Sequence, residues 1–84
     1  MQTATPEQFE ALQDIAQQND GRLRSYSGRG MYGAQCLGVT TEYPNSVMED
    51  AGAAGIKGAR QDSMGLKTIV YWPHIGVPEY FKED

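Results

Sequence analysis

The sequence has very little of the two residue types that build disulfide frameworks and zinc sites. Cys36 is the only cysteine and His74 the only histidine among 84 residues. One cysteine excludes an intramolecular disulfide, and a structural zinc site needs more thiolate and imidazole ligands than this chain has. We therefore expect no disulfide framework, no bound metal and no cofactor.

Large aliphatic side chains are also scarce. Leu, Ile, Val and Phe together account for 14 of the 84 residues. A domain of this size hides a smaller share of its surface than a larger domain does. We therefore expect Ala, Gly, Met and Tyr to fill much of the core, and the small core leaves both a monomer and a homodimer open.

Long apolar runs and a basic leader are absent as well. No stretch approaches the roughly 20 apolar residues that a membrane-spanning helix requires. The N-terminus lacks the basic-then-apolar pattern of a secretory signal. We therefore expect a cytoplasmic protein with no membrane partner.

What the chain does contain is two segments with helical spacing of apolar residues. The first predicted helix covers residues 6–19 and begins at a capping box formed by Thr5 and Gln8. The second predicted helix has Ser46 and Glu49 as its capping box. The start of each helix is therefore predicted from local sequence signals alone.

Four segments alternate in polarity or are rich in β-branched and aromatic residues, which is typical of strands. They cover residues 22–27, 36–41, 57–62 and 66–72. The order of elements is then α-β-β-α-β-β. It predicts an α+β fold, a two-layer sandwich in which two helices cover one face of a four-stranded, mostly antiparallel sheet.

The whole chain, residues 1–84, is predicted to be a single domain built from two similar halves. The first αββ unit covers residues 6–41 and the second covers residues 44–72. A proline introduces each predicted helix, and each first strand carries an arginine and leads to a turn with a serine. The pattern suggests an internal duplication, although any fold of alternating helices and hairpins is punctuated in a similar way.

Residues 73–84 form the predicted tail, which contains Tyr80 and Phe81 and has an acidic end. Two interpretations are open. The tail is a disordered end of the chain, or its aromatic residues dock on the protein's own sheet or on a neighbouring subunit.

Charge is separated along the chain, although the net charge is only −4. Residues 1–20 carry acidic side chains and no basic ones, whereas residues 21–41 carry three arginines and no acid. Residues 42–55 are again acidic, and residues 56–78 are basic on balance. This pattern predicts an acidic helical layer and a basic sheet.

The loop SGRGMYGAQ places Gly28, Gly30 and Gly33 at the spacing G-x-G-x-x-G. A dinucleotide fingerprint requires a helix directly after the loop, but a strand is predicted here. A kinase glycine loop is excluded by the missing valine and lysine motifs. Two interpretations are left: a tightly turned hairpin tip, or a recognition loop with Met31 and Tyr32 as apolar anchors.

The candidate binding residues lie on this loop and on the strand before it. Backbone N–H groups, arginines and hydroxyls there suit a phosphate or carboxylate. A strand face of arginine and tyrosine is also typical of sheets that stack nucleic-acid bases, although ordinary solvated side chains give the same pattern. The predicted ligand- or partner-binding residues are Arg24, Ser25, Tyr26, Ser27, Gly28, Arg29, Gly30, Met31 and Tyr32.

Catalytic chemistry has little support in the sequence. A nucleophile pair of Cys36 and His74 would need to meet in the fold beside a supporting group such as Asp62. The acidic residues on the helices are explained by solvated helix faces. We therefore expect a protein that is not an enzyme.

Several stretches resemble small uncharacterised proteins of phage and prophage type. They are residues 24–33 (RSYSGRGMYG) with Cys36, residues 62–65 (DSMG) and residues 69–73 (IVYWP). The resemblance spans about residues 6–75 and transfers no functional residues. It implies a phage accessory protein acting in the host cytoplasm.

The leading hypothesis is a small non-enzymatic protein that binds a host protein stoichiometrically, as an anti-defence or host-modulating inhibitor. Arg29, Met31 and Tyr32 at the loop tip are its expected contacts. The alternative is capture of an anionic small molecule, a phosphorylated metabolite or nucleotide, by the basic glycine-rich hairpin. Binding of nucleic acid is a weaker form of that alternative.

Overall fold

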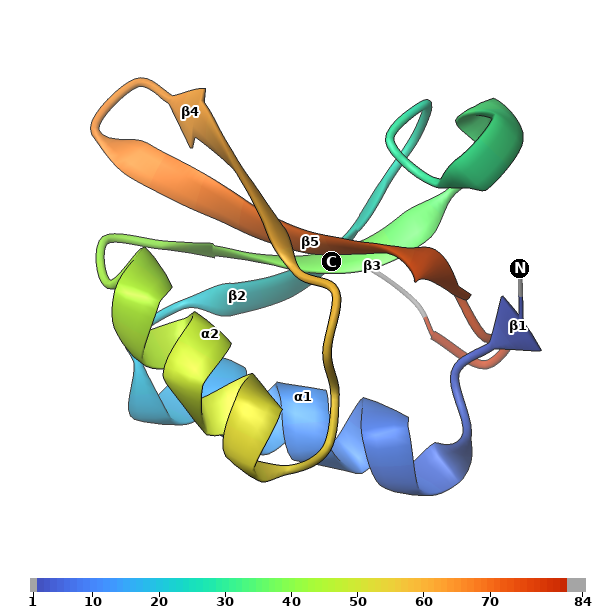
Figure 1. Ribbon diagram of the computed structural model, residues 1–84, viewed down its shortest axis with the longest axis horizontal. Coiled ribbons are helices and arrows are strands. Elements are labelled where there is room, and N and C mark those ends of the chain that lie inside the picture. The colour runs from blue at the N-terminus through green and yellow to red at the C-terminus, as the bar shows by residue number, and fades with distance from the viewer. Residues whose placement is uncertain (1, 82–84) are drawn as a thin grey trace.

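The computed structural model describes residues 2–81 and has a mixed α+β fold (Figure 1). Two α-helices accompany a five-stranded, mostly antiparallel sheet. In chain order the elements are β1 (Gln2–Thr3), α1 (Pro6–Gln18), β2 (Arg22–Tyr26), the 3-10 turn η1 (Met31–Gly33), β3 (Cys36–Thr41), α2 (Pro44–Ala53), β4 (Arg60–Met64) and β5 (Lys67–Gly76).

The sheet has the order β1-β5-β3-β2, and β4 also pairs with β5. The prediction of four strands is wrong because β1 pairs in parallel with the end of β5, through Gln2 with Ile75 and Thr3 with Gly76. Two residues are too few to show an alternating pattern. The same pairing extends β5 to Gly76, so residues 73–76 of the predicted tail belong to a strand.

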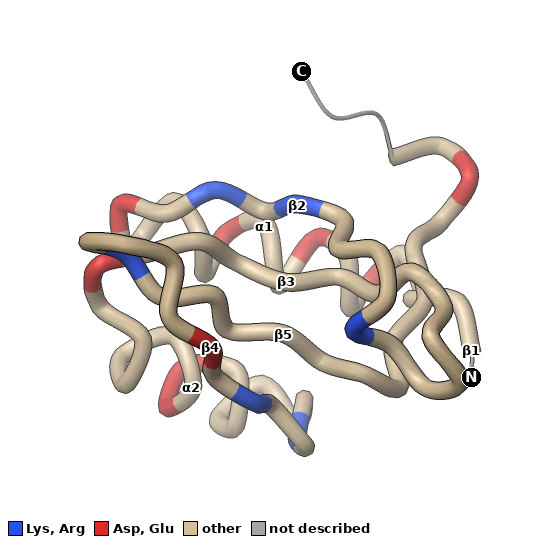
Figure 2. Tube along the Cα trace, turned by 90° about the horizontal axis from the view of Figure 1, so that it is seen from above, with Lys and Arg blue, Asp and Glu red and all other residues tan. Residues whose placement is uncertain are grey.

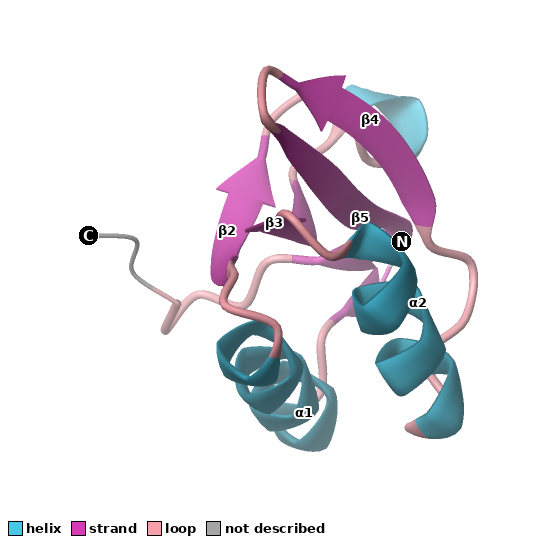
Figure 3. Cartoon of the chain, turned by 90° about the vertical axis from the view of Figure 1, so that its left-hand side faces the viewer, coloured by secondary structure: helices cyan, strands magenta, loops and turns pink. Residues whose placement is uncertain are grey.

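Both helices lie on one side of the sheet (Figures 1 and 3). The predicted capping box of α1 is confirmed: the Gln8 N–H donates to Thr5 Oγ1 at 3.1 Å, and the Thr5 N–H donates to Gln8 Oε1 at 3.0 Å. Neither helix in the described part of the chain is long and apolar enough to cross a membrane.

The capping box predicted for α2 is wrong. The helix starts at Pro44 with Tyr43 as its N-cap, and no side chain makes a capping bond there. Proline has a fixed φ that suits the first helical position, so Pro44 starts the helix two residues before Ser46. The Tyr43 N–H donates instead to Thr41 Oγ1 at 3.0 Å.

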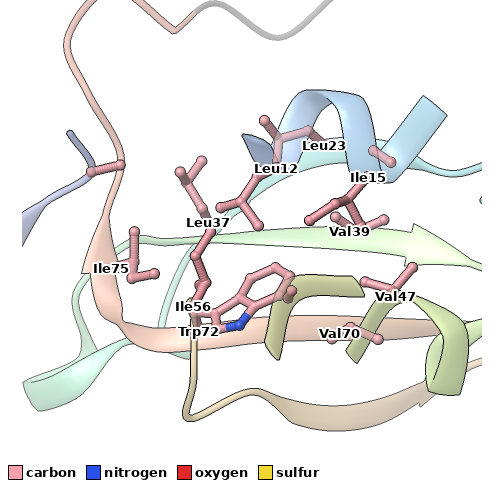
Figure 4. Packing of buried hydrophobic residues seen from close by; sticks show 13 residues of the cluster. Leu12, Ile15, Leu23, Leu37, Val39, Val47, Ile56, Val70, Trp72 and Ile75 are labelled. Carbon is pink, nitrogen blue, oxygen red and sulfur yellow. The ribbon is translucent and has the colours of Figure 1, made fainter. Parts of the chain in front are cut away.

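The hydrophobic core lies between the helices and the sheet (Figure 4). Trp72 is the largest fully buried side chain, with 0% of its surface exposed. Its indole packs in the same cluster as Leu37, Val47 and Ile56, which come from a strand, a helix and a loop. Trp72 Nε1 has no hydrogen-bond partner among the described residues.

The aromatic residues of the tail dock on the protein itself, where both contact α1. The Phe9 ring meets Tyr80 and Phe81 edge-on, with ring centres 5.3 Å apart in both pairs. Phe81 also packs against the core cluster. The acidic end of the predicted tail lies outside the described residues.

Candidate binding face and hairpin tips

The sheet face that points away from the helices, here called the outer face, is defined by strand register. Leu23, Val39 and Val70 pack in the core, so their neighbours along each strand point the opposite way. Two rows of paired residues cross the outer face, Arg24-Gly38-Tyr71-Arg60 and Arg22-Thr40-Ile69-Asp62, each in the order β2, β3, β5, β4.

Tyr26 lies over the centre of the outer face. Its hydroxyl is hydrogen-bonded to the Thr40 hydroxyl on β3. A Cβ atom added at Gly38 would lie 2.7 Å from Cε2 of the Tyr26 ring. The absence of a side chain at Gly38 is therefore what lets the ring lie there, next to Tyr71 on β5.

Arg29 does not point out from the loop tip. Its guanidinium forms an ion pair with Asp62 on β4, and its Cζ lies 5.6 Å from the centre of the Tyr71 ring. The hydrogen bond from Arg29 lowers the pKa of the Asp62 carboxyl below its ordinary value and raises the pKa of Arg29. The loop is thus tied to the second hairpin across Tyr71.

The ion pair gives the first prediction. Because its pKa is lowered in the fold, Asp62 stabilises the folded state at pH values above the ordinary pKa of an aspartate. This stabilisation is lost as the pH falls through the lowered pKa of the folded state. Arg29→Gln should raise the pKa of Asp62, measured by carboxyl ¹³C NMR. Arg22→Gln, on the same face but at the opposite edge strand, should leave that titration unchanged.

An Asp62 titration that is the same in Arg29→Gln and in the wild type would show that the ion pair does not form in solution.

One feature of the sequence could have indicated this contact: Asp62 is the only acidic residue among residues 56–78. Nothing in the sequence showed that its partner would come from the first hairpin.

Tyr32 stands at the tip of the first hairpin with 98% of its surface exposed, and Met31 beside it is 44% exposed. The loop is closed by its own backbone, since the Gly30 N–H donates to the Ala34 carbonyl at 2.9 Å and the Gly33 N–H donates to the Gly30 carbonyl at 3.0 Å. The apolar anchors that the sequence predicts are therefore held out on a structured turn.

The second hairpin has a similar tip. Gly65 has a φ of 65° and begins a two-residue turn between the paired residues Met64 and Lys67, which is the pattern of a type II′ hairpin. Leu66 is 97% exposed there, and Met64 is 45% exposed. Leu66 is not among the binding residues predicted from the sequence, although an apolar residue directly after a turn glycine is the local signal for it.

The two serines of the predicted site do not gather with the arginines. Ser25 pairs with Leu37, which places it on the opposite face from Arg24. Ser27 accepts a hydrogen bond from Gln35 Nε2 at 3.2 Å. The arrangement therefore offers arginines and tyrosines on the outer face and apolar side chains at the tips, without a hydroxyl cluster.

Cys36 lies fully buried in β3. Burial raises the pKa of its thiol above the ordinary value, against a smaller lowering by the charge of Arg29. This is the opposite of what a nucleophilic cysteine needs, since the thiolate is the reactive form. No group of three or more potential metal ligands occurs among residues 2–81.

Charge is distributed unevenly around the fold. Seen from the sheet side, basic residues lie along β2 and β4, and most acidic residues lie on or beside the helices (Figure 2). Of the strand residues on the outer face, Arg22, Arg24, Arg60 and Lys67 are basic and Asp62 is acidic. This face therefore attracts anions although the chain as a whole is negatively charged.

Comparisons with protein-family models, with curated proteins and with solved structures gave no match.

Proposed function

We propose that this is a non-enzymatic binding protein that recognises a partner protein with its two hairpin tips, Met31 with Tyr32 and Met64 with Leu66. The observation that carries the proposal is that Tyr32 and Leu66 are 98% and 97% exposed on short turns. Apolar and aromatic side chains on a supported turn lose little conformational freedom when a partner buries them, which is the chemistry of interface hot spots.

The surroundings of the two tips also indicate the chemistry of the partner's surface. Both hairpins rise from the side of the fold away from the helices (Figure 1), and the outer face belongs to the strands that carry them. That face is rich in basic residues. A partner with apolar recesses in an acidic surface would fit both the tips and the charge.

The resemblance to phage and prophage proteins supports a particular setting for this binding. The partner would be a host protein in the cytoplasm, and the protein would act as an anti-defence or host-modulating inhibitor by stoichiometric binding. Such a role needs a surface and no catalytic group.

The experiment compares three serine variants for binding to a partner isolated from host cells and then purified. Tyr32→Ser and Leu66→Ser should each weaken binding at least about tenfold by calorimetry, with one partner bound per chain in the wild type. Tyr43→Ser is the matched control, because Tyr43 is 55% exposed but lies at the start of α2.

Circular dichroism should show unchanged folding for both tip variants, since their side chains contact mainly solvent. If both tip variants bind the purified partner as tightly as the wild type, the tips are not the interface. A loss of affinity equal to that of Tyr43→Ser would also contradict the proposal.

We also propose that the fold is a two-layer sandwich of duplicated αββ units. Each unit contributes one antiparallel hairpin, β2 with β3 and β4 with β5. The second strands of the two units, β3 and β5, pair with each other in antiparallel fashion at the centre. From either edge of the order β2-β3-β5-β4, the first strand of one unit is therefore followed by the second strand of the same unit.

A further inference from the structure

We infer that the outer face binds a nucleotide, meaning an aromatic base that carries a phosphate, between Tyr26 and Tyr71 and the arginines around them. This site is separate from the hairpin tips. The inference does not depend on the proposed protein partner.

The base would pack on the two tyrosines. Tyr71 pairs directly with Gly38, and the Tyr26 ring lies over the same glycine, so the two aromatic side chains are neighbours on the sheet. Both residues are of intermediate burial, so neither is fully enclosed by the protein. Bases stack favourably on aromatic side chains of an open sheet face, and such stacking tolerates different bases because each has a flat π-face.

The phosphate would be held by the arginines. Arg29 already binds an oxyanion in the structure, the carboxylate of Asp62, and its Cζ lies over the Tyr71 ring. Arg24 and Arg60 stand at the two ends of the row that contains Tyr71. The Arg29 guanidinium at the Tyr71 ring and Arg60, which pairs with Tyr71 across the ladder, suit an anion that is bonded to a flat base, because guanidinium matches phosphate oxygens in pairs.

Asp62 would compete with the phosphate for Arg29. The Arg29 and Asp62 side chains are 33% and 47% exposed, and ion pairs this open to water are weak. A phosphate with up to two negative charges can therefore displace the carboxylate. Removing the carboxylate should strengthen nucleotide binding rather than weaken it.

Calorimetry with four probes tests the site. AMP should bind more tightly than either adenosine or inorganic phosphate, because only AMP offers both the base and the anion. A ten-nucleotide single-stranded oligo(dA) distinguishes the source of the ligand: binding at similar affinity per site indicates nucleic acid as well as free nucleotide, whereas weaker binding indicates the free nucleotide. If none of the four probes binds, the inference is wrong.

Substitutions that are expected to change the affinity for AMP in opposite directions distinguish this site from a general attraction of anions. Arg29→Gln should weaken AMP binding, and Tyr71→Leu should weaken it about fivefold or more. Asp62→Asn should strengthen it roughly two- to fivefold. Asp14→Asn on α1 makes the same change in net charge away from the outer face, so an equal gain in that variant would overturn the inference.

Two further comparisons keep the test decisive. If Tyr71→Leu does not fold, Asp62→Asn against Asp14→Asn still decides the question, because both side chains are exposed. Tyr32→Leu removes an aromatic ring from the hairpin tip and should leave AMP affinity unchanged. A loss of AMP binding in Tyr32→Leu would place the ligand at the tip and contradict the site on the outer face.

Discussion

Trp72→Ala is expected to lower the free energy of unfolding by about 3–5 kcal/mol, the usual cost of truncating a buried aromatic side chain. Trp72 is 0% exposed and packs in the buried cluster with Leu37, Val47 and Ile56. Small domains are stable by only about 5–15 kcal/mol, so this loss is a large part of the total. Urea denaturation followed by circular dichroism measures it.

Trp72→Phe is the matched variant. It keeps most of the ring volume and removes an indole N–H that has no hydrogen-bond partner among the described residues. An unpaired buried donor costs free energy, so its removal offsets part of the lost packing. We expect Trp72→Phe to be clearly more stable than Trp72→Ala, and equal losses in the two variants would contradict this account of the core.

Gly38→Ala is expected to lower the free energy of unfolding by about 1–3 kcal/mol, as overpacking does in a tightly packed region. The new Cβ would lie 2.7 Å from the Tyr26 ring and 2.9 Å from the Val70 carbonyl oxygen. The ring can swing away, but the carbonyl belongs to β5, which pairs with β3 at this point. The variant should therefore lose stability and also displace Tyr26.

Two measurements check the Gly38 prediction. Urea denaturation gives the stability, and the NMR signals of Tyr26 and Thr40 show whether their hydroxyl bond is lost. Gly52→Ala is the control, because a Cβ there has nothing within 4 Å and alanine favours a helix by about 0.5–1 kcal/mol over glycine. A Gly38→Ala protein as stable as the wild type, with Tyr26 unmoved, would contradict the role given to this glycine.

The elements that the sequence predicts correctly are those with local signals. The capping box of Thr5 and Gln8, the helical spacing in α1 and the alternation around Leu23 all act over a few residues. The error at α2 is also local, because Ser46 and Glu49 make a credible capping box that the nearby proline overrides.

The features that the sequence did not predict depend on contacts between distant residues. β1 is a strand only because the end of β5 lies beside it. The pairing of Arg29 with Asp62 joins two hairpins across 33 positions of the chain. Strand alternation does predict that Arg24 and Tyr26 share a face, but only the order of strands places Tyr71 and Arg60 with them.

The backbone of Tyr32 has a φ of 59°, in the left-handed region where most residues other than glycine are strained. A tyrosine there costs roughly 1 kcal/mol more than a glycine would. Contacts of the side chain within the protein offset little of this strain, since 98% of its surface is in solvent. The chain therefore keeps an aromatic ring at a position where folding alone would favour glycine, as we expect if the tip makes the proposed contact with a partner.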